Sequence, residues 1–279
     1  MNKRKNSTII GFEVDQYFSG NDAMLLNFEF QQITNSQSKP TIVLIHGLFG
    51  SLSNLGVIAR ALESEYSILQ IDVRNHGKSA HDVEMNYSVM AQDVMETLDH
   101  LNIEHFSVIG HSMGGKIAMK LTELAPQRLQ NLIVLDMSPF AYQENHHDSI
   151  FKALFAVQQA NIISRKEAYE IMQTFLKEDM VIQFLLKGFS KGQWLFNVQA
   201  IFDHYVDIIG WDTISLWSKP TLFIRGGRSP YISKDKHIQA IDQQFNHVEL
   251  ETIENAGHWL HAEQPNQITS IIKYFLNKN

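Results

Sequence analysis

One short stretch limits the possible folds of this chain more than any other. Residues 106–109 (FSVI) are mainly apolar and predict a buried strand, and residues 113–125 predict a helix. Ser112 occupies the sharp turn between them, within the pattern Gly-x-Ser-x-Gly formed with Gly110 and Gly114. Small residues at these two positions let the strand and the helix pack closely around a strained serine. We therefore expect Ser112 to be a nucleophile at the N-terminus of a helix, where backbone amides favour negative charge.

Around this stretch, predicted strands alternate with predicted helices. After an antiparallel edge strand at 25–33, strands are predicted at 41–45, 68–73, 106–109, 132–135, 220–224 and 248–253, and helices at 54–62, 88–101, 113–125 and 268–276. Most of these strands are continuously apolar, which indicates burial on both faces. The predicted fold class is α/β, with a mostly parallel central sheet flanked by helices.

The alternation stops between residues 139 and 218. Helices are predicted there at 150–159, 165–177, 179–189 and 200–209. A helical block inserted between two parallel strands would lie over the carboxyl edge of the sheet, where ligands bind in such folds. We predict a core made of residues 24–138 and 219–279, a helical lid (cap) made of 139–218, and an unassigned N-terminal extension, 1–23.

Composition excludes several classes of function. The chain has 279 residues and a net charge of -7, which gives no support for binding nucleic acid. It contains no cysteine, so disulfides, thiolate metal sites and cysteine nucleophiles are excluded. No apolar run is long enough for a signal peptide or a membrane span, and we expect a cytoplasmic protein without a membrane partner.

A serine nucleophile that transfers acyl groups needs two backbone amides to hold the developing oxyanion. Residues 46–50 (HGLFG) follow the first core strand and form a glycine-containing loop beside the predicted Ser112 turn. In folds of this kind that loop supplies one amide, and the residue after the serine supplies the other. We expect the amides of Leu48 and Met113 to form the oxyanion hole.

The general base must be a histidine, and His258 is the candidate. It follows Gly257 in the loop after the last predicted strand, and serine first with histidine last is the chain order such folds use. His261 could suggest a metal pair, but no third ligand is evident, so it is interpreted as packing or surface. His146 and His147 are interpreted as an exposed pair at the lid entrance. No metal or cofactor is implied.

The acid that orients the histidine is less obvious. The loop after the strand at 220–224 has Ser229 where an aspartate is expected, whereas the strand at 132–135 ends at Asp136. A carboxylate at the end of a buried strand is costly unless it is paired, and the ring N–H of His258 would pair it. We predict Asp136 as the acid and Ser229 as an additional hydrogen-bond partner. The alternative is that Asp136 caps the lid entrance.

Apolar residues beside the oxyanion loop and in the lid are candidates for substrate binding: Phe49, Phe140, Leu185, Trp194 and Phe202. At helical spacing such residues can equally belong to the core of the lid.

Five stretches carry a resemblance to a known family: residues 46–52 (HGLFGSL), 74–77 (RNHG), 110–116 (GHSMGGK), 181–187 (VIQFLLK) and 256–263 (AGHWLHAE). Between residues 25 and 276 the chain resembles the small bacterial esterases of the YbfF type, a branch of the α/β-hydrolase superfamily. The resemblance implies a carboxylester and acyl-CoA thioester hydrolase. It also implies an acid after the earlier strand and a serine at 229 near the histidine.

The leading hypothesis is therefore a serine hydrolase that cleaves carboxylic esters or acyl-CoA thioesters through an acyl-enzyme on Ser112. Its partner would be a small-molecule acyl ester or acyl-CoA. A C–C bond hydrolase or lyase on the same fold is the first alternative. A hydrolase-fold protein that binds a ligand without turnover is an alternative of another class.

Overall fold

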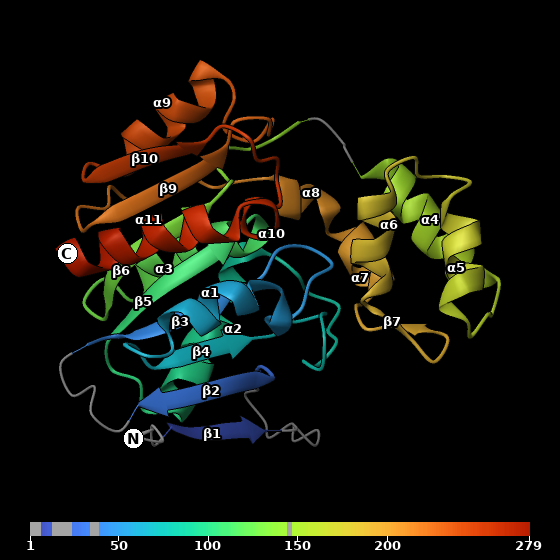
Figure 1. The fold of residues 1–279 in the computed structure, drawn as a ribbon, viewed down its shortest axis with the longest axis horizontal. Helices are drawn as coiled ribbons and strands as arrows, with labels where there is room; N and C mark the ends of the chain where they lie inside the picture. Colours follow the sequence, from blue (N-terminus) through green and yellow to red (C-terminus); the bar gives the residue numbers. More distant parts are fainter. Residues whose placement is uncertain (1–6, 13–23, 34–38, 144–146) are drawn as a thin grey trace.

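The computed structural model of the protein describes residues 7–12, 24–33, 39–143 and 147–279 (Figure 1). Its centre is an eight-stranded sheet in the order β1-β2-β4-β3-β5-β6-β9-β10. The strands are β1 (Ser7–Phe12), β2 (Phe28–Ile33), β3 (Thr41–Ile45), β4 (Ile68–Ile71), β5 (Phe106–His111), β6 (Leu129–Leu135), β9 (Thr221–Gly226) and β10 (Val248–Ile253). Every neighbouring pair from β4 to β10 is parallel, and β2 pairs antiparallel with β1 and β4. The predicted mostly parallel sheet is confirmed.

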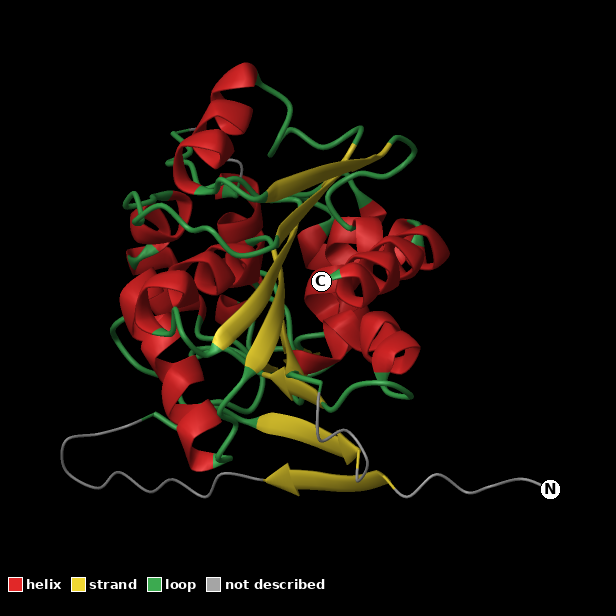
Figure 2. Ribbon diagram, turned by 90° about the vertical axis from the view of Figure 1, so that its left-hand side faces the viewer, coloured by secondary structure: helices red, strands yellow, loops and turns green. Residues whose placement is uncertain are grey.

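Helices cover both faces of this sheet (Figure 2). They are η1 (Leu52–Leu55), α1 (Gly56–Leu62), α2 (Tyr87–His100), α3 (Met113–Leu124), α9 (Asp235–Gln244), α10 (Leu260–Glu263) and α11 (Pro265–Lys278). Alternate residues of each core strand enter different apolar layers: in β3, Val43 joins the layer with Ile117 of α3, and Leu44 joins the layer with Ile272 of α11. This two-sided burial is what the continuous apolar strands predicted.

Helix α9 is absent from the sequence prediction, and its burial pattern explains why. Its buried face is made of His237, Ala240, Ile241 and Gln244. Two of these four side chains are polar, so a search for apolar residues at helical spacing does not find this buried face. The structure satisfies the polar side chain of Gln244, whose amide donates to the carbonyl of Pro139 at 3.1 Å.

The segment between β6 and β9 forms a second layer beside the sheet, to its right in Figure 1. It contains α4 (Asp148–Gln159), α5 (Arg165–Met172), α6 (Asp179–Leu186), the hairpin of β7 (Phe189–Ser190) and β8 (Gln193–Trp194), α7 (Val198–Asp203) and α8 (Tyr205–Ile209). The helix predicted at 200–209 is two short helices, because the backbone leaves helical geometry at His204 (φ -101°, ψ 16°). None of the helices in the described part of the chain combines the length and apolar character needed to cross a membrane.

Part of the N-terminal extension belongs to the sheet. β1 pairs antiparallel with β2, with Ser7 opposite Ile33 and Phe12 opposite Phe28. From the sequence alone, this extension (residues 1–23) is unassigned. The strand covers residues 7–12, and residues 13–18 lie outside the described part.

Two glycines let α3 start directly against the sheet. A Cβ on Gly110 would overlap the carbonyl group of Gly114, and a Cβ on Gly114 would overlap the carbonyl oxygens of Ile45 and His46. These are backbone atoms, which cannot rotate away as the end of a side chain can. The crossing of β3, β5 and α3 at the serine turn therefore requires glycine at both positions.

We expect Gly114→Ala to lower the free energy of unfolding by about 1–3 kcal/mol, because added atoms in a tightly packed place force the backbone apart. Urea unfolding followed by circular dichroism measures this. Gly56→Ala is the matched control, since a Cβ there would meet only the flexible end of Arg60, at 3.2 Å. Equal unfolding midpoints for the two variants would contradict the steric argument.

Candidate active site

Ser112 lies between the last residue of β5 and the first residue of α3. Its backbone adopts the left-handed region (φ 55°, ψ -119°), which a non-glycine residue occupies only under strain. The amide of Ser112 donates to the carbonyl of Leu135 at 3.0 Å, which fixes the turn to the neighbouring strand β6. The predicted strand–turn–helix arrangement is confirmed. It places the serine side chain at the carboxyl edge of the sheet.

A chain of hydrogen bonds runs from Ser112 through His258 to Asp136. The hydroxyl of Ser112 lies 2.9 Å from Nε2 of His258, and Nδ1 of His258 lies 2.6 Å from Oδ2 of Asp136. Since a carboxylate only accepts, Nδ1 carries the proton and Nε2 is free to accept from the serine. The structure brings the predicted nucleophile, base and acid together from three separate loops.

Asp136 is fully buried, and several donors surround its carboxylate. Oδ1 accepts from the amide of Gly226 at 2.9 Å, and Oδ2 accepts from His258 and from the hydroxyl of Ser229. Its backbone also occupies the left-handed region, with φ 53°. These bonds offset the cost of burying the charge and direct one oxygen at the imidazole.

Two further histidines shape the loop that follows β3. Nδ1 of His46 donates to the carbonyl of Gly47 at 2.8 Å, and Nε2 of His76 accepts from the amide of Phe49 at 3.1 Å. Burial lowers the pKa of His46 to about 4 and that of His76 to about 3, so both rings are neutral at pH 7. His76 received no role from the sequence, although it stands in the family-like stretch 74–77.

The amides of Leu48 and Met113 are available donors beside this loop. Neither amide donates to an acceptor within the part of the chain that the structure describes. Leu48 and Ser112 line the same cavities, and Met113 is the first residue of α3. A pair of unused amides next to a serine can stabilise an oxyanion formed at that serine.

Histidines also pack behind the base. Nε2 of His111 donates to the backbone carbonyl of His258 at 2.8 Å, and the ring of His261 packs against the ring of His111, with centroids 4.5 Å apart. Burial lowers the pKa of His111 well below its usual value and that of His261 to about 4. His261 is therefore a packing residue, one of the two roles expected for it. Within the described ranges, no three histidine, aspartate or glutamate side chains are grouped to hold a metal.

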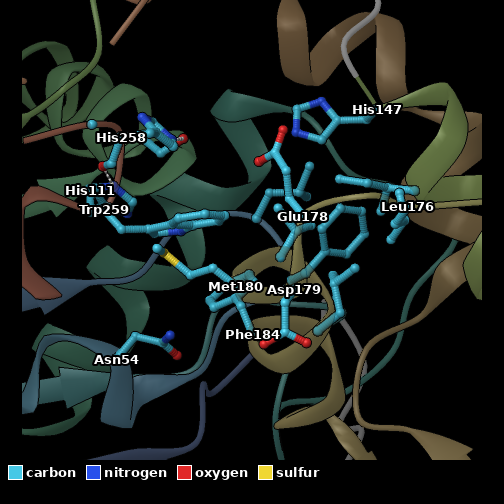
Figure 3. Close-up of a pocket in the computed structure, with 18 of the residues that line it drawn as sticks. Asn54, His111, His147, Leu176, Glu178, Asp179, Met180, Phe184, His258 and Trp259 are labelled. Carbon is cyan, nitrogen blue, oxygen red and sulfur yellow. Dashed lines mark hydrogen bonds between the residues drawn. The ribbon is translucent and has the colours of Figure 1, made fainter. Parts of the chain in front are cut away.

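Two cavities meet at Ser112. The larger has a volume of about 820 Å³ and lies between the sheet edge and α6 (Figure 3). The smaller has a volume of about 50 Å³ and extends toward α8. Four residues line both: Leu48, Ser112, His147 and Tyr231.

The five apolar candidates for substrate binding fall into two groups. Phe49 and Leu185 line the large cavity. The other three line neither cavity. Phe140 packs on Tyr142 and His237, Trp194 is buried against Phe189 and Phe196 of the inserted segment, and Phe202 is half exposed beside Phe151 and Phe155.

The location of His147 differs from the one predicted from the sequence. The sequence predicts an exposed pair here, but the side chain of His147 is half-buried and its Nδ1 lies 2.5 Å from the hydroxyl of Tyr205. It lines both cavities, and Figure 3 shows it facing the interior of the large one. A polar pair in sequence says nothing about which helix will cover it. His146 lies outside the described residues.

Comparison with known proteins agrees with this geometry. The sequence matches the alpha/beta hydrolase fold family over residues 40–160 and 151–265. It is 46% identical to Esterase YbfF of Escherichia coli over 91% of this chain and 100% of that protein. It is 34% identical to the sn-1-specific diacylglycerol lipase ABHD11 of Danio rerio, over 92% of this chain and 86% of that protein.

The fold comparison gives the same result. A solved structure titled "Marine microorganism esterase" superposes with a TM-score of 0.83 at 33% identity, and covers 90% of this chain and 99% of that one. The family match spans the parallel strands from β3 to β10, the serine turn, the inserted helices and the histidine loop. The chain therefore belongs to the α/β-hydrolase fold family.

Proposed function

We propose that the protein is a serine hydrolase that cleaves carboxylic esters through an acyl-enzyme on Ser112. The observation that carries this proposal is the hydrogen-bonded series Ser112, His258 and Asp136. In the first step the hydroxyl oxygen attacks the ester carbonyl while His258 takes its proton. The amides of Leu48 and Met113 hold the oxyanion, and His258 then gives the proton to the leaving alcohol.

Water completes the proposed reaction. His258 takes a proton from a water molecule, which attacks the acyl-enzyme, and Ser112 regains its proton when the acid leaves. Asp136 keeps the imidazole in the correct tautomer and stabilises its charged form. In this scheme residues 24–138 and 219–279 supply the reacting groups, and residues 139–218 act as a lid that closes over the substrate.

Oxygen esters fit the large cavity better than acyl-CoA thioesters. The carboxylates of Glu178, Asp179 and Glu263 line it together with the ammonium group of Lys177. Glu263 is paired with Arg228 at 3.1 Å, and the carboxylate of Asp179 accepts from the hydroxyl of Tyr169 at 2.7 Å, but both residues keep their negative charge at the cavity. A lining with more acidic than basic groups does not favour the phosphates of coenzyme A. The names of the relatives, an esterase and a diacylglycerol lipase, also favour uncharged esters.

The test is a fluorophosphonate probe followed by a substrate panel. We expect the probe to label Ser112, as identified by peptide mass spectrometry, and p-nitrophenyl esters to turn over with a higher kcat/KM than the matching acyl-CoA. Labelling and turnover should both disappear in Ser112→Ala. If the protein neither reacts with the probe nor hydrolyses any ester, it is a ligand-binding member of the family and the proposal is wrong. A higher kcat/KM for acyl-CoA than for the matching ester would contradict the proposed preference for oxygen esters.

Ser229→Ala should lower kcat by about tenfold, because Asp136 keeps its bonds to Gly226 and His258 while one neutral donor is lost. Steady-state hydrolysis of p-nitrophenyl acetate measures the change. Ser233→Ala is the control, since that hydroxyl lies in the same loop and is bonded only locally, to the carbonyl of Pro230. A loss as large as that of Asp136→Asn would mean that Ser229 does more than share the hydrogen bond.

A further inference from the structure

We infer that the small cavity is the acyl subsite and that it restricts the enzyme to short, uncharged acyl groups of roughly two to four carbons, with the large cavity holding the alcohol. This inference rests on the proposed ester hydrolysis and adds the substrate class. It follows from three features: which cavity contains His258, the volume of the other cavity, and the way its walls are held.

The position of His258 decides which part of the ester enters which cavity. The imidazole must protonate the leaving oxygen, so the alcohol lies on the histidine side of Ser112. His258 and its neighbours Gly257 and Trp259 line the large cavity and are absent from the lining of the small one. With the oxyanion directed to the amides of Leu48 and Met113, the remaining substituent of the carbonyl, the acyl chain, points into the small cavity.

The volume of the small cavity sets the length of that chain. It is about 50 Å³, against about 820 Å³ for the large cavity. A cavity needs roughly 10–15 Å³ of such volume for one water-sized group. The small cavity, which Ser112, Leu48 and Met113 also line, therefore accepts on the order of three to five non-hydrogen atoms including the carbonyl carbon and oxygen, which corresponds to an acetyl to butanoyl group.

Hydrogen bonds to backbone carbonyls hold the walls of the small cavity in place. The hydroxyl of Tyr87 donates to the carbonyl of Ile208 at 2.5 Å, and that of Tyr142 donates to the carbonyl of Tyr231 at 2.6 Å. The ammonium group of Lys116 donates to the carbonyls of Ile209 and Gly210 at 2.9 and 2.7 Å. A longer chain would have to break these buried bonds, which costs free energy for each group left unpaired.

The lining also selects an uncharged chain. Leu48, Met113, Met137 and Ile208 present apolar side chains, and the tyrosines present their rings. Lys116 also reaches this wall, but burial lowers its pKa to about 7, and its nitrogen is engaged by the two carbonyls at the end of α8 and lies 5.0 Å from the centre of the Tyr142 ring. Lys116 therefore fastens α8 to α3, four residues after the nucleophile.

The experiment varies the two halves of the ester independently. For the wild-type protein we expect kcat/KM of p-nitrophenyl esters to fall at least tenfold from butanoate to octanoate, since each excess methylene must find room in a filled pocket. For acetate esters, enlarging the alcohol from ethyl to naphthyl should not lower kcat/KM. Equal or better hydrolysis of the octanoate would overturn the assignment of the small cavity.

Variants at one wall position test the same assignment. Ile208→Ala enlarges the small cavity and should raise the ratio of hexanoate to butanoate kcat/KM about tenfold. Ile208→Val removes less volume and should shift the ratio in the same direction by a smaller factor. It provides the test if the alanine variant does not fold. Ile201→Ala is the matched control, because Ile201 is a buried residue of α7 that lines neither cavity. An unchanged ratio in folded Ile208 variants, or an equal change in the control, would overturn the inference.

The two proposals fail in different ways. If no ester of any length is hydrolysed and Ser112 is not labelled, the proposed function is wrong and the acyl subsite falls with it. If hydrolysis depends on Ser112 but favours long acyl chains, the proposed function stands and only the acyl subsite is wrong.

Discussion

Replacing Ser112 with alanine should lower kcat for ester hydrolysis by about 10⁴-fold or more while the protein stays folded. The hydroxyl supplies the atom that attacks the ester, and no neighbouring side chain can take its place in the turn. The substitution leaves the backbone bond from residue 112 to Leu135 intact, because that bond uses the main chain. The measurements are kcat with p-nitrophenyl acetate and the unfolding midpoint in urea.

His258→Ala supplies the internal control for this prediction. It should cause a loss of similar size, and the double variant Ser112→Ala, His258→Ala should be little worse than either single one, because the two groups act as a unit. The residual rate would come from substrate binding and the two amides. More than a tenth of wild-type activity in Ser112→Ala would contradict the assignment of the nucleophile.

The sequence predicted those parts of the site that depend on local chain geometry. The serine turn could be recognised because a strand, a turn and a helix in immediate succession need glycine at positions 110 and 114, where a side chain would strike the backbone. Asp136 could be found because a charged residue at the end of a buried strand must have a partner. Both signals can be recognised within a few residues, although the groups that explain them lie far along the chain: Ile45 and His46 against Gly114, and His258 beside Asp136.

Features that depend on the packing of distant elements could not be predicted in this way. Trp194 and Leu185 are both apolar residues of the inserted segment, yet only Leu185 reaches the cavity. Periodicity identifies an apolar face but not the element that covers it. The small cavity forms where α3 meets α8, which lie about ninety residues apart and are joined through Lys116. His76 likewise reaches Phe49 across a separation of 27 residues.

Asp136→Asn should lower kcat by about 10³- to 10⁴-fold with little change in fold. The asparagine amide oxygen can accept one of the present bonds, but its NH₂ group would face a donor instead of an acceptor. The imidazole of His258 would then favour the tautomer with its proton on Nε2, which cannot accept the proton of Ser112. Asparagine also tolerates the left-handed backbone of residue 136 better than most residues do.

The position of Ser229 allows a second test of the role of Asp136, with double variants. Its hydroxyl already bonds to Oδ2 of Asp136, the oxygen that holds His258, so a carboxylate at 229 would start close to the imidazole. The double variant Asp136→Asn, Ser229→Asp should therefore recover part of the rate that Asp136→Asn loses, whereas Asp136→Asn, Ser229→Ala should recover none. Activity of Asp136→Asn within a few-fold of wild type would show that another group orients His258. Recovery in both double variants would show that the gain does not come from the new carboxylate.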